Sequence, residues 1–280
     1  DDLKEVLDSE VFIDLQRLRD SARNGVPPSM RQQVWKYLLR VSILDKSEEV
    51  THVKHQLEMY HSFSKQVSTT DTDMRLVMQA CKKHYPRLFA DPKARQKVEH
   101  VLLCYLTPHK QQHPFFMEAL VHLVRPFIIF ENVADMYYCF TSFMSMIGGF
   151  FTLDSLRQSV ASFLMLLQHT LPDLHAHFDE EQVDANQWLV EWFASLLSKQ
   201  LRLEDTLHLW DSYFVLGPEQ GFSLHPYVCL AILQQHREKL LDMDSDELLR
   251  FLSILPKTNI DMVIRGAYNI REFVSSRELL

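Results

Sequence analysis

The chain passes from a turn into an amphipathic helix within the stretch GVPPSMRQQVWKYLL, residues 25–39. Gly25 and the pair Pro27-Pro28 interrupt the preceding pattern, because glycine favours turns and proline cannot continue a helix. Ser29 followed by Gln32 has the form of a capping box, so we expect Ser29 to cap the new helix. Apolar side chains then share one helical face, which is predicted to be buried: Val34, Trp35, Leu38 and Leu39.

The same helical spacing of apolar residues extends in both directions from this stretch. Upstream, Val11, Leu15 and Leu18 recur at intervals of four and three. Downstream segments with this spacing begin near Val98, Phe116, Val133, Leu156, Trp188, Leu207, Val228 and Leu248. We count about ten helices joined by short loops, one of them running from Val228 to Leu241. Strict alternation does not persist, so no strands are expected and the predicted fold is all-α.

The composition argues against several classes of function. Only six of the 280 residues are glycine, which leaves few positions for hairpin turns and nucleotide-binding loops. With 37 acidic and 29 basic side chains the net charge is −8, so no global basic field is available to hold nucleic acid or an anionic membrane. We expect a protein or small-molecule partner and no nucleic acid.

The cysteines and the apolar stretches indicate a cytoplasmic protein. The four cysteines are spread through apolar helical segments without a CxxC pair: Cys81, Cys104, Cys139 and Cys229. They are interpreted as reduced core residues. Arg125, Glu131 and Asp135 interrupt the longest apolar run before it reaches membrane-spanning length, so no transmembrane segment is predicted. Because the sequence starts at Asp1, we expect it to be part of a longer chain.

The sequence contains no self-sufficient catalytic or cofactor motif. Of its fourteen histidines, those with the most metal-like spacing are His84 with Cys81, and His109 with His113. Neither pair completes a four-ligand set and no HExxH occurs, so no metal site is predicted. The motifs GxSxG, GxxxxGKS/T and GxGxxG are also absent, so we expect neither a cofactor nor a nucleotide bound by this chain alone.

Three segments together resemble the TBC domain, the helical domain of Rab GTPase-activating proteins. Residues 25–39 are similar to the family's opening pattern G-I/V-P-x-x-x-R-x-x-V-W-x-x-L-L. Residues 192–211, which begin with Trp-Phe and end with Leu-Trp-Asp, resemble a later stretch of the family. Residues 248–256 are similar to its closing L-x-x-L-P helix.

The resemblance implies an all-α domain of two helical lobes at residues 21–272. It leaves an N-terminal helical extension at residues 1–20 and a C-terminal tail at residues 273–280. The most recognisable motif residues are thought to hold helices together in this family, so they indicate the fold and not an activity: Arg31, Trp35, Trp210 and Asp211.

The resemblance also implies two catalytic side chains that a TBC domain supplies to a bound Rab. One is an arginine that neutralises charge on the transferred phosphoryl group, and the other is a glutamine that positions the attacking water. Residues 77–86 overlay the arginine motif I-x-x-D-x-x-R-T-F-P, with Ala80 in place of the aspartate and Lys83 in place of the arginine. A lysine ammonium cannot form the planar fork that bridges two phosphate oxygens.

The glutamine motif, Y-x-Q-G, is also altered. His113, Phe115 and Phe116 replace its tyrosine, glutamine and glycine when Tyr105 to Met117 are overlaid on the family segment. A phenylalanine side chain cannot orient water. Two glutamines, Gln111 and Gln112, are close by but precede Pro114 in the loop: neither stands at the motif position.

A competing alignment makes Arg75 a displaced arginine finger. The aspartates before it, Asp71 and Asp73, stand four and two residues back, whereas the motif requires three. This alignment also leaves the later Tyr85-Pro86 pair unexplained. If Arg75 acted, the Rab's own glutamine would have to position the water, as in other GTPase activators.

The function that follows from this resemblance is a degenerate TBC domain that docks a Rab-family GTPase or another trafficking protein without accelerating hydrolysis. It is expected to be cytoplasmic, and peripheral on membranes only through its partners. The residues expected to contact the partner are His84, Tyr85, Gln111, Gln112, His113 and Phe116. Two alternatives remain: an active GTPase activator that uses Arg75 or Lys83, and a purely structural subunit that never meets a GTPase.

Overall fold

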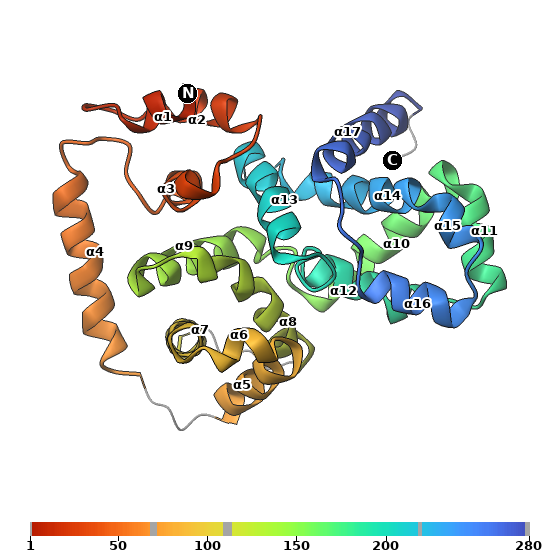
Figure 1. The fold of residues 1–280 in the computed structure, drawn as a ribbon, viewed down its shortest axis with the longest axis horizontal. Helices are drawn as coiled ribbons and strands as arrows, with labels where there is room; N and C mark the ends of the chain where they lie inside the picture. Colours follow the sequence, from red (N-terminus) through yellow and green to blue (C-terminus); the bar gives the residue numbers. More distant parts are fainter. Residues whose placement is uncertain (1, 68–71, 109–113, 218–219, 278–280) are drawn as a thin grey trace. The chain divides into compact units, whose positions relative to one another are not determined.

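The computed structural model describes residues 2–67, 72–108, 114–217 and 220–277, and these ranges are mainly helical (Figure 1). The α-helices are α1 (Asp2–Leu7), α2 (Leu15–Ala22), α3 (Pro28–Leu38), α4 (Glu49–Ser64), α5 (Thr72–His84), α6 (Pro86–Ala90), α7 (Pro92–Leu106), α8 (Pro114–Val124), α9 (Val133–Ile147), α10 (Leu153–Thr170), α11 (Pro172–Glu180), α12 (Leu189–Ala194), α13 (Leu203–Leu216), α14 (His225–Gln235), α15 (Arg237–Leu241), α16 (Ser245–Ser253) and α17 (Ile260–Ser276). Three 3-10 helices complete the set: η1 (Arg125–Ile129), η2 (Ala185–Gln187) and η3 (Phe222–Leu224).

The predicted all-α fold is confirmed. Within the described ranges there is no β-strand, only an isolated bridge between Phe12 and Asp45. Among the helices described, none has both the length and the apolar character needed to cross a bilayer. All four cysteines are buried free thiols, in agreement with their interpretation as core residues.

The helices form two compact units, which are described separately. The first comprises Asp1–Ile147 together with Phe214–Gly217, and the second comprises Gly148–Tyr213 together with Pro218–Leu280. The chain therefore leaves the first unit after α9 and returns to it briefly at the end of α13.

The core of the first unit is built around Trp35 of α3, whose side chain has no exposed surface. Its ring lies edge-on to Phe127 of η1 at 5.6 Å and to Phe214 at 4.8 Å between centroids. Such pairs add roughly 0.5–1.5 kcal/mol to the stabilisation from burial alone. Arg31 donates a hydrogen bond from Nη2 to the carbonyl of Val26 at 3.1 Å and so ties α3 to the turn before it.

Helix α3 begins two residues earlier than a cap at Ser29 would place it. It starts at Pro28 with Pro27 in the N-cap position and no side-chain cap, so the predicted capping box of Ser29 and Gln32 is wrong. Pro28 is suited to the first helical position because its φ is preset and it has no N–H that needs an acceptor. Gln32 instead accepts the backbone N–H of Glu131 at 3.2 Å, which links α3 to the segment after η1.

The second unit is held by indole hydrogen bonds in its core. Trp192 donates from Nε1 to the carbonyl of Leu252 in α16 at 2.8 Å. Trp210 donates from Nε1 to the carbonyl of Leu196 at 3.1 Å. Leu196 and Leu197 both have positive φ, 47° and 66°, in the left-handed region that L-residues rarely adopt. The Trp210 bond therefore secures a strained turn inside the core.

The described ranges contain seventeen α-helices, more than the expected ten or so. Short helices such as α6 and α15 span five residues each, too few for an apolar spacing to become recognisable in the sequence. The single helix expected from Val228 to Leu241 is wrong, because α14 ends and α15 begins around His236. His236 has φ −106° and ψ 10°, which lies outside the α-helical region.

Candidate functional site

The two motif positions identified in the sequence lie on α5 and α8, which pack against each other in the first unit. Helix α5 ends at His84 because the next residue, Tyr85, precedes Pro86, and a residue before proline is disfavoured in the helical conformation. The last turn of α5 carries Lys82, Lys83 and His84. Cations there complement the partial negative charge of a helix C-terminus, so Lys83 also has a structural role.

Lys83 and His84 converge on one carboxylate, that of Glu118 in α8. The Nζ atom of Lys83 lies 3.7 Å from Oε1 of Glu118, and Nε2 of His84 lies 2.6 Å from the same oxygen. The Lys83 side chain is 72% exposed and that of Glu118 47% exposed, so their ion pair contributes at most about 1 kcal/mol. The residue aligned with the family's arginine thus faces a counter-anion.

A partly buried network adjoins this pair. The hydroxyl of Tyr85 is hydrogen-bonded to Nδ1 of His122 at 2.6 Å, and the rings of His84 and His122 meet edge-on at 4.7 Å. The guanidinium of Arg125 lies over the Tyr85 ring, 4.9 Å from its centroid. Burial raises the pKa of Tyr85 although Arg125 opposes the shift, so Tyr85 stays a neutral phenol. His84 is therefore braced by groups that are themselves held in place.

The position predicted to correspond to the family's glutamine is occupied by a half-buried aromatic ring. Phe115 is the second residue of α8, and its ring meets that of Phe116 edge-on at 5.4 Å. Phe116 is only 5% exposed and belongs to the core of the unit. Gln111, Gln112 and His113 lie outside the described residues, so their expected contacts with a partner stay predictions.

The alternative finger, Arg75, is an exposed residue at the other end of α5. Eight residues separate it from Lys83, a rise of about 12 Å along the helix axis at 1.5 Å per residue. Arg75 and Lys83 are therefore too far apart along α5 to contact a phosphoryl group bound at the same position. The cluster of Lys83, His84 and Glu118 does not include Arg75.

Metal or thiol chemistry gains no support from the described part of the chain. Its histidines, cysteines and carboxylates form no group of three that could hold a metal ion. Cys81, three residues before His84, is fully buried, and burial raises the pKa of its thiol to about 12. At neutral pH this thiol stays protonated and is a poor nucleophile.

Sequence reasoning missed Glu118 of this cluster and two residues beside it, His122 and Arg125. A signal was present, because polar side chains recur at intervals of four and three within the otherwise apolar segment 115–127. Together the cluster offers ammonium, imidazole and carboxylate groups that can bind polar groups on a protein surface. The guanidinium of Arg125, which lies beside the cluster, is packed on the Tyr85 ring.

Comparison with known sequences identifies the relatives of this chain. The sequence model described as the Rab-GTPase-TBC domain matches residues 28–241. GTPase-activating protein gyp1 of Schizosaccharomyces pombe is 26% identical over 90% of this chain and 55% of its own length. The TBC domain-containing protein kinase-like protein of Homo sapiens is 26% identical over 89% of this chain and 27% of its own length. TBC1 domain family member 22A of Homo sapiens is 24% identical over 92% of this chain and 57% of its own length.

Solved structures show the same fold. The crystal structure of the Ypt/Rab-GAP domain of Gyp1p matches with a TM-score of 0.83 at 19% identity, covering 96% of both chains. The Chlamydomonas flagellar RabGAP TBC domain matches with a TM-score of 0.68 at 18% identity, covering 91% of this chain and 85% of that one. The three relatives named above extend well beyond the matched region, since the chain spans between 27% and 57% of their lengths.

Proposed function

The chain belongs to the Rab-GTPase-TBC domain family, and from that premise we propose that it binds a Rab-family small GTPase without accelerating GTP hydrolysis. The chain would act as a docking module in membrane traffic, cytoplasmic and attached to membranes only through its partners. The domain would span residues 21–272, with the segments 1–20 and 273–280 as an extension and a tail. Any phenotype of the whole protein would then reflect binding of the GTPase and not the rate of GTP hydrolysis.

The contact between Lys83 and Glu118 carries this proposal. An arginine finger contributes about 10³–10⁵ in rate because its fork neutralises charge on the transferred phosphoryl group. Lys83 has a single compact ammonium, and Glu118 lies 3.7 Å from it. A phosphoryl group at this position would meet the Glu118 carboxylate together with the lysine, so the positive field that catalysis requires would be weakened.

Phe115 supports the same conclusion for the second catalytic side chain. Its ring has no hydrogen-bonding group, and it is half-buried beside Phe116. An attacking water would therefore depend on the GTPase's own glutamine. Binding survives these losses, because interface anchors set affinity whereas fingers act mainly in the transition state.

A single-turnover GTP hydrolysis assay across a panel of GTP-loaded Rabs tests the absence of activation. We expect no stimulation by the wild-type chain. Stimulation that Lys83→Ala, Arg75→Ala or Arg125→Ala abolishes would contradict the proposal and identify the residue that acts. Arg125→Ala is included because Arg125 is the guanidinium in contact with the cluster.

The binding half of the proposal needs a separate measurement. Pull-downs with Rabs loaded with GDP or a non-hydrolysable GTP analogue should reveal at least one nucleotide-dependent partner. A chain that serves only as a structural subunit would show no dependence on nucleotide. The variant Lys83→Arg with Phe115→Gln is an informative addition, since both side chains are restored where the family motifs have them. With a bound Rab it should gain stimulation, and more so when Glu118→Gln is added.

A further inference from the structure

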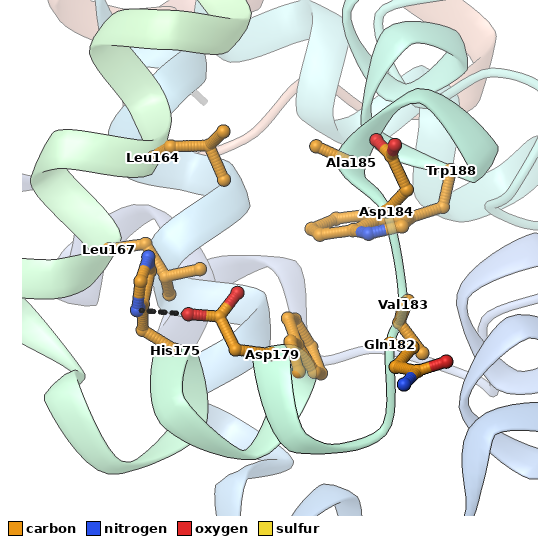
Figure 2. Close-up of a pocket in the computed structure, with 10 residues that line it drawn as sticks. Leu164, Leu167, His175, Asp179, Gln182, Val183, Asp184, Ala185 and Trp188 are labelled. Atoms are coloured by element: carbon orange, nitrogen blue, oxygen red, sulfur yellow. Dashed lines mark ion pairs between the residues drawn. The ribbon is translucent and has the colours of Figure 1, made fainter.

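The second unit contains a cavity that plays no part in the proposed function. It has a volume of about 350 Å³ and lies between α10, α11 and the segment that leads through η2 to Trp188. Figure 2 shows the side chains of Leu164 and Leu167 on one side of this space and Asp184, Ala185 and Trp188 on the other. The cavity is open to solvent and is lined by one unit of the chain.

The floor and the rim of the cavity differ in chemistry. Leu167, Phe178 and Trp188 are buried and form an apolar floor, and the rings of Phe178 and Trp188 meet edge-on at 5.7 Å. Asp179 and Asp184 are exposed and stand at the rim, with their carboxylates on two sides of the space (Figure 2). His175 steadies one of them, its Nδ1 lying 3.6 Å from Oδ2 of Asp179.

The Trp188 indole carries an N–H group without an acceptor. Trp188 is 3% exposed, its ring extends into the cavity from the side of Asp184 (Figure 2), and its Nε1 has no hydrogen-bond partner. The indoles of Trp192 and Trp210, which are buried in the same unit, both donate to carbonyl oxygens. A buried N–H without a partner costs about 1–3 kcal/mol, so the packing around the Trp188 ring is less well satisfied than that around Trp192 or Trp210.

The charge around the cavity selects the kind of ligand. Segment 172–187 contains five carboxylates and no lysine or arginine. Asp173 pairs with Arg237, and Glu181 accepts the backbone N–H of Ser245, so these two are engaged within the unit. Asp184 caps η2 by accepting the backbone N–H of Asn186 at 2.8 Å, and Asp179 pairs with His175, but both carboxylates are exposed at the rim beside an aromatic surface. None of the side chains that line the cavity is a lysine or arginine.

We propose that this cavity binds a lysine or arginine side chain of a partner peptide. The alkyl stem lies against the leucines, and the cation sits between Asp179 and Asp184 over the aromatic surface. An ammonium or guanidinium is attracted both by carboxylates and by the face of an indole. The site is independent of the cluster around Lys83, because all of its lining residues belong to the second unit.

The indole N–H resonances of the chain labelled with ¹⁵N test this directly. The four tryptophans give four such signals, and the signal of Trp188 is identified by its absence in Trp188→Phe. The probes are Nα-acetyl-arginine methylamide and Nα-acetyl-lysine methylamide. We expect one or both to shift the Trp188 signal saturably while the other three indole signals move less.

Matched variants and probes separate the site from general charge attraction. Asp179→Asn combined with Asp184→Asn should weaken binding about tenfold, the equivalent of about 1.4 kcal/mol. Glu180→Gln removes a neighbouring carboxylate that does not line the cavity, and it should leave binding unchanged. Asparagine still caps η2, so Asp184→Asn is expected to fold. If it does not, Asp179→Asn alone decides.

Three results would overturn the inference. One is the absence of a saturable shift at Trp188 with either basic probe. Another is an equal shift with the norleucine analogue, which shares the alkyl stem without the charge and would indicate an apolar pocket only. The last is unchanged affinity after removal of both rim carboxylates, which would show that the cation is bound elsewhere.

Discussion

Two clusters of polar groups, one in each unit, differ in their exposure to solvent. One comprises Lys83, His84 and Glu118 in the first unit, and the other comprises Tyr213, His225 and the carbonyl of Trp192 in the second. The pair of Lys83 and Glu118 is largely exposed to solvent. His225 is 2% exposed and is hydrogen-bonded on both sides. The Tyr213 hydroxyl donates to its Nδ1 at 2.6 Å, and its Nε2 donates to the carbonyl of Trp192 at 2.9 Å.

The exposed cluster around Lys83 is expected to contact a partner, and the buried cluster around His225 is expected to stabilise the fold. An exposed ion pair contributes little to stability, so a substitution at Lys83 or Glu118 should leave the fold intact. A buried hydrogen-bonded group has one acceptable geometry, and loss of one partner leaves the other unsatisfied. The motif tryptophans of the second unit therefore act on stability, whereas substitutions around Lys83 are expected to act on binding.

The largest effect on stability is expected for a buried tryptophan of the second unit. Trp210→Ala should lower the free energy of unfolding by about 3–5 kcal/mol, because it leaves a large cavity and removes the donor to Leu196. Trp210→Phe keeps an aromatic ring and should lose only about 1–3 kcal/mol. Urea denaturation followed by circular dichroism measures both values. Equal losses for the two variants would show that the indole N–H has no special role.

The next effect is a dependence of stability on pH that arises from His225. Burial lowers the pKa of His225 from 6.5 to about 4. The unfolded chain therefore binds a proton at a higher pH than the folded chain does. The contribution of His225 to stability is complete above about pH 6.5 and is lost as the pH falls towards 4, a total of about 3 kcal/mol.

Urea denaturation at several pH values between 7 and 4 tests this expectation. The variant His225→Gln is the control, since an amide can still donate and accept but does not titrate in this range. The wild-type chain should lose about 3 kcal/mol more than the variant as the solution is acidified. Parallel losses in the two chains would assign the acid sensitivity to other groups, among them His100 and His236, whose pKa values burial also lowers.

The smallest effect is expected for the exposed ion pair of Lys83 and Glu118. A double-mutant cycle of Lys83→Ala and Glu118→Gln should give a coupling free energy below about 1 kcal/mol. The coupling should diminish further at high salt, because exposed charges are screened. A coupling of several kcal/mol would mean that the pair is part of the fold's stability, and substitutions there would then not act on binding alone.

Several features were predictable because they depend on local pattern. The spacing of Val34, Trp35 and Leu38 indicated a buried helical face, and all three side chains are buried. Leu207, Trp210 and Phe214 were expected to share a helix and lie together on α13. The closing helix was expected to stop before Pro256, and α16 ends at Ser253.

Other features could not be predicted from local pattern. The contact between His84 and Glu118 joins residues 34 positions apart, and the spacing within either helix does not specify which residues will meet. The unpartnered N–H of Trp188 is equally invisible in the sequence, where Trp188 and Trp192 look alike as core residues. Only the packing of the second unit gives Trp192 an acceptor in Leu252 and leaves Trp188 without one.

The sequence by itself determined that this chain is helical and that its motifs are those of the Rab-GTPase-TBC domain family. It also predicted that lysine and phenylalanine stand at the positions of the two catalytic side chains. These are properties of residue identity and spacing. The tertiary structure alone decided that Glu118 faces Lys83 and that an acidic, aromatic cavity forms beside Trp188. Both depend on which distant side chains are brought within a few ångströms, because charge pairing and burial act between neighbours in space.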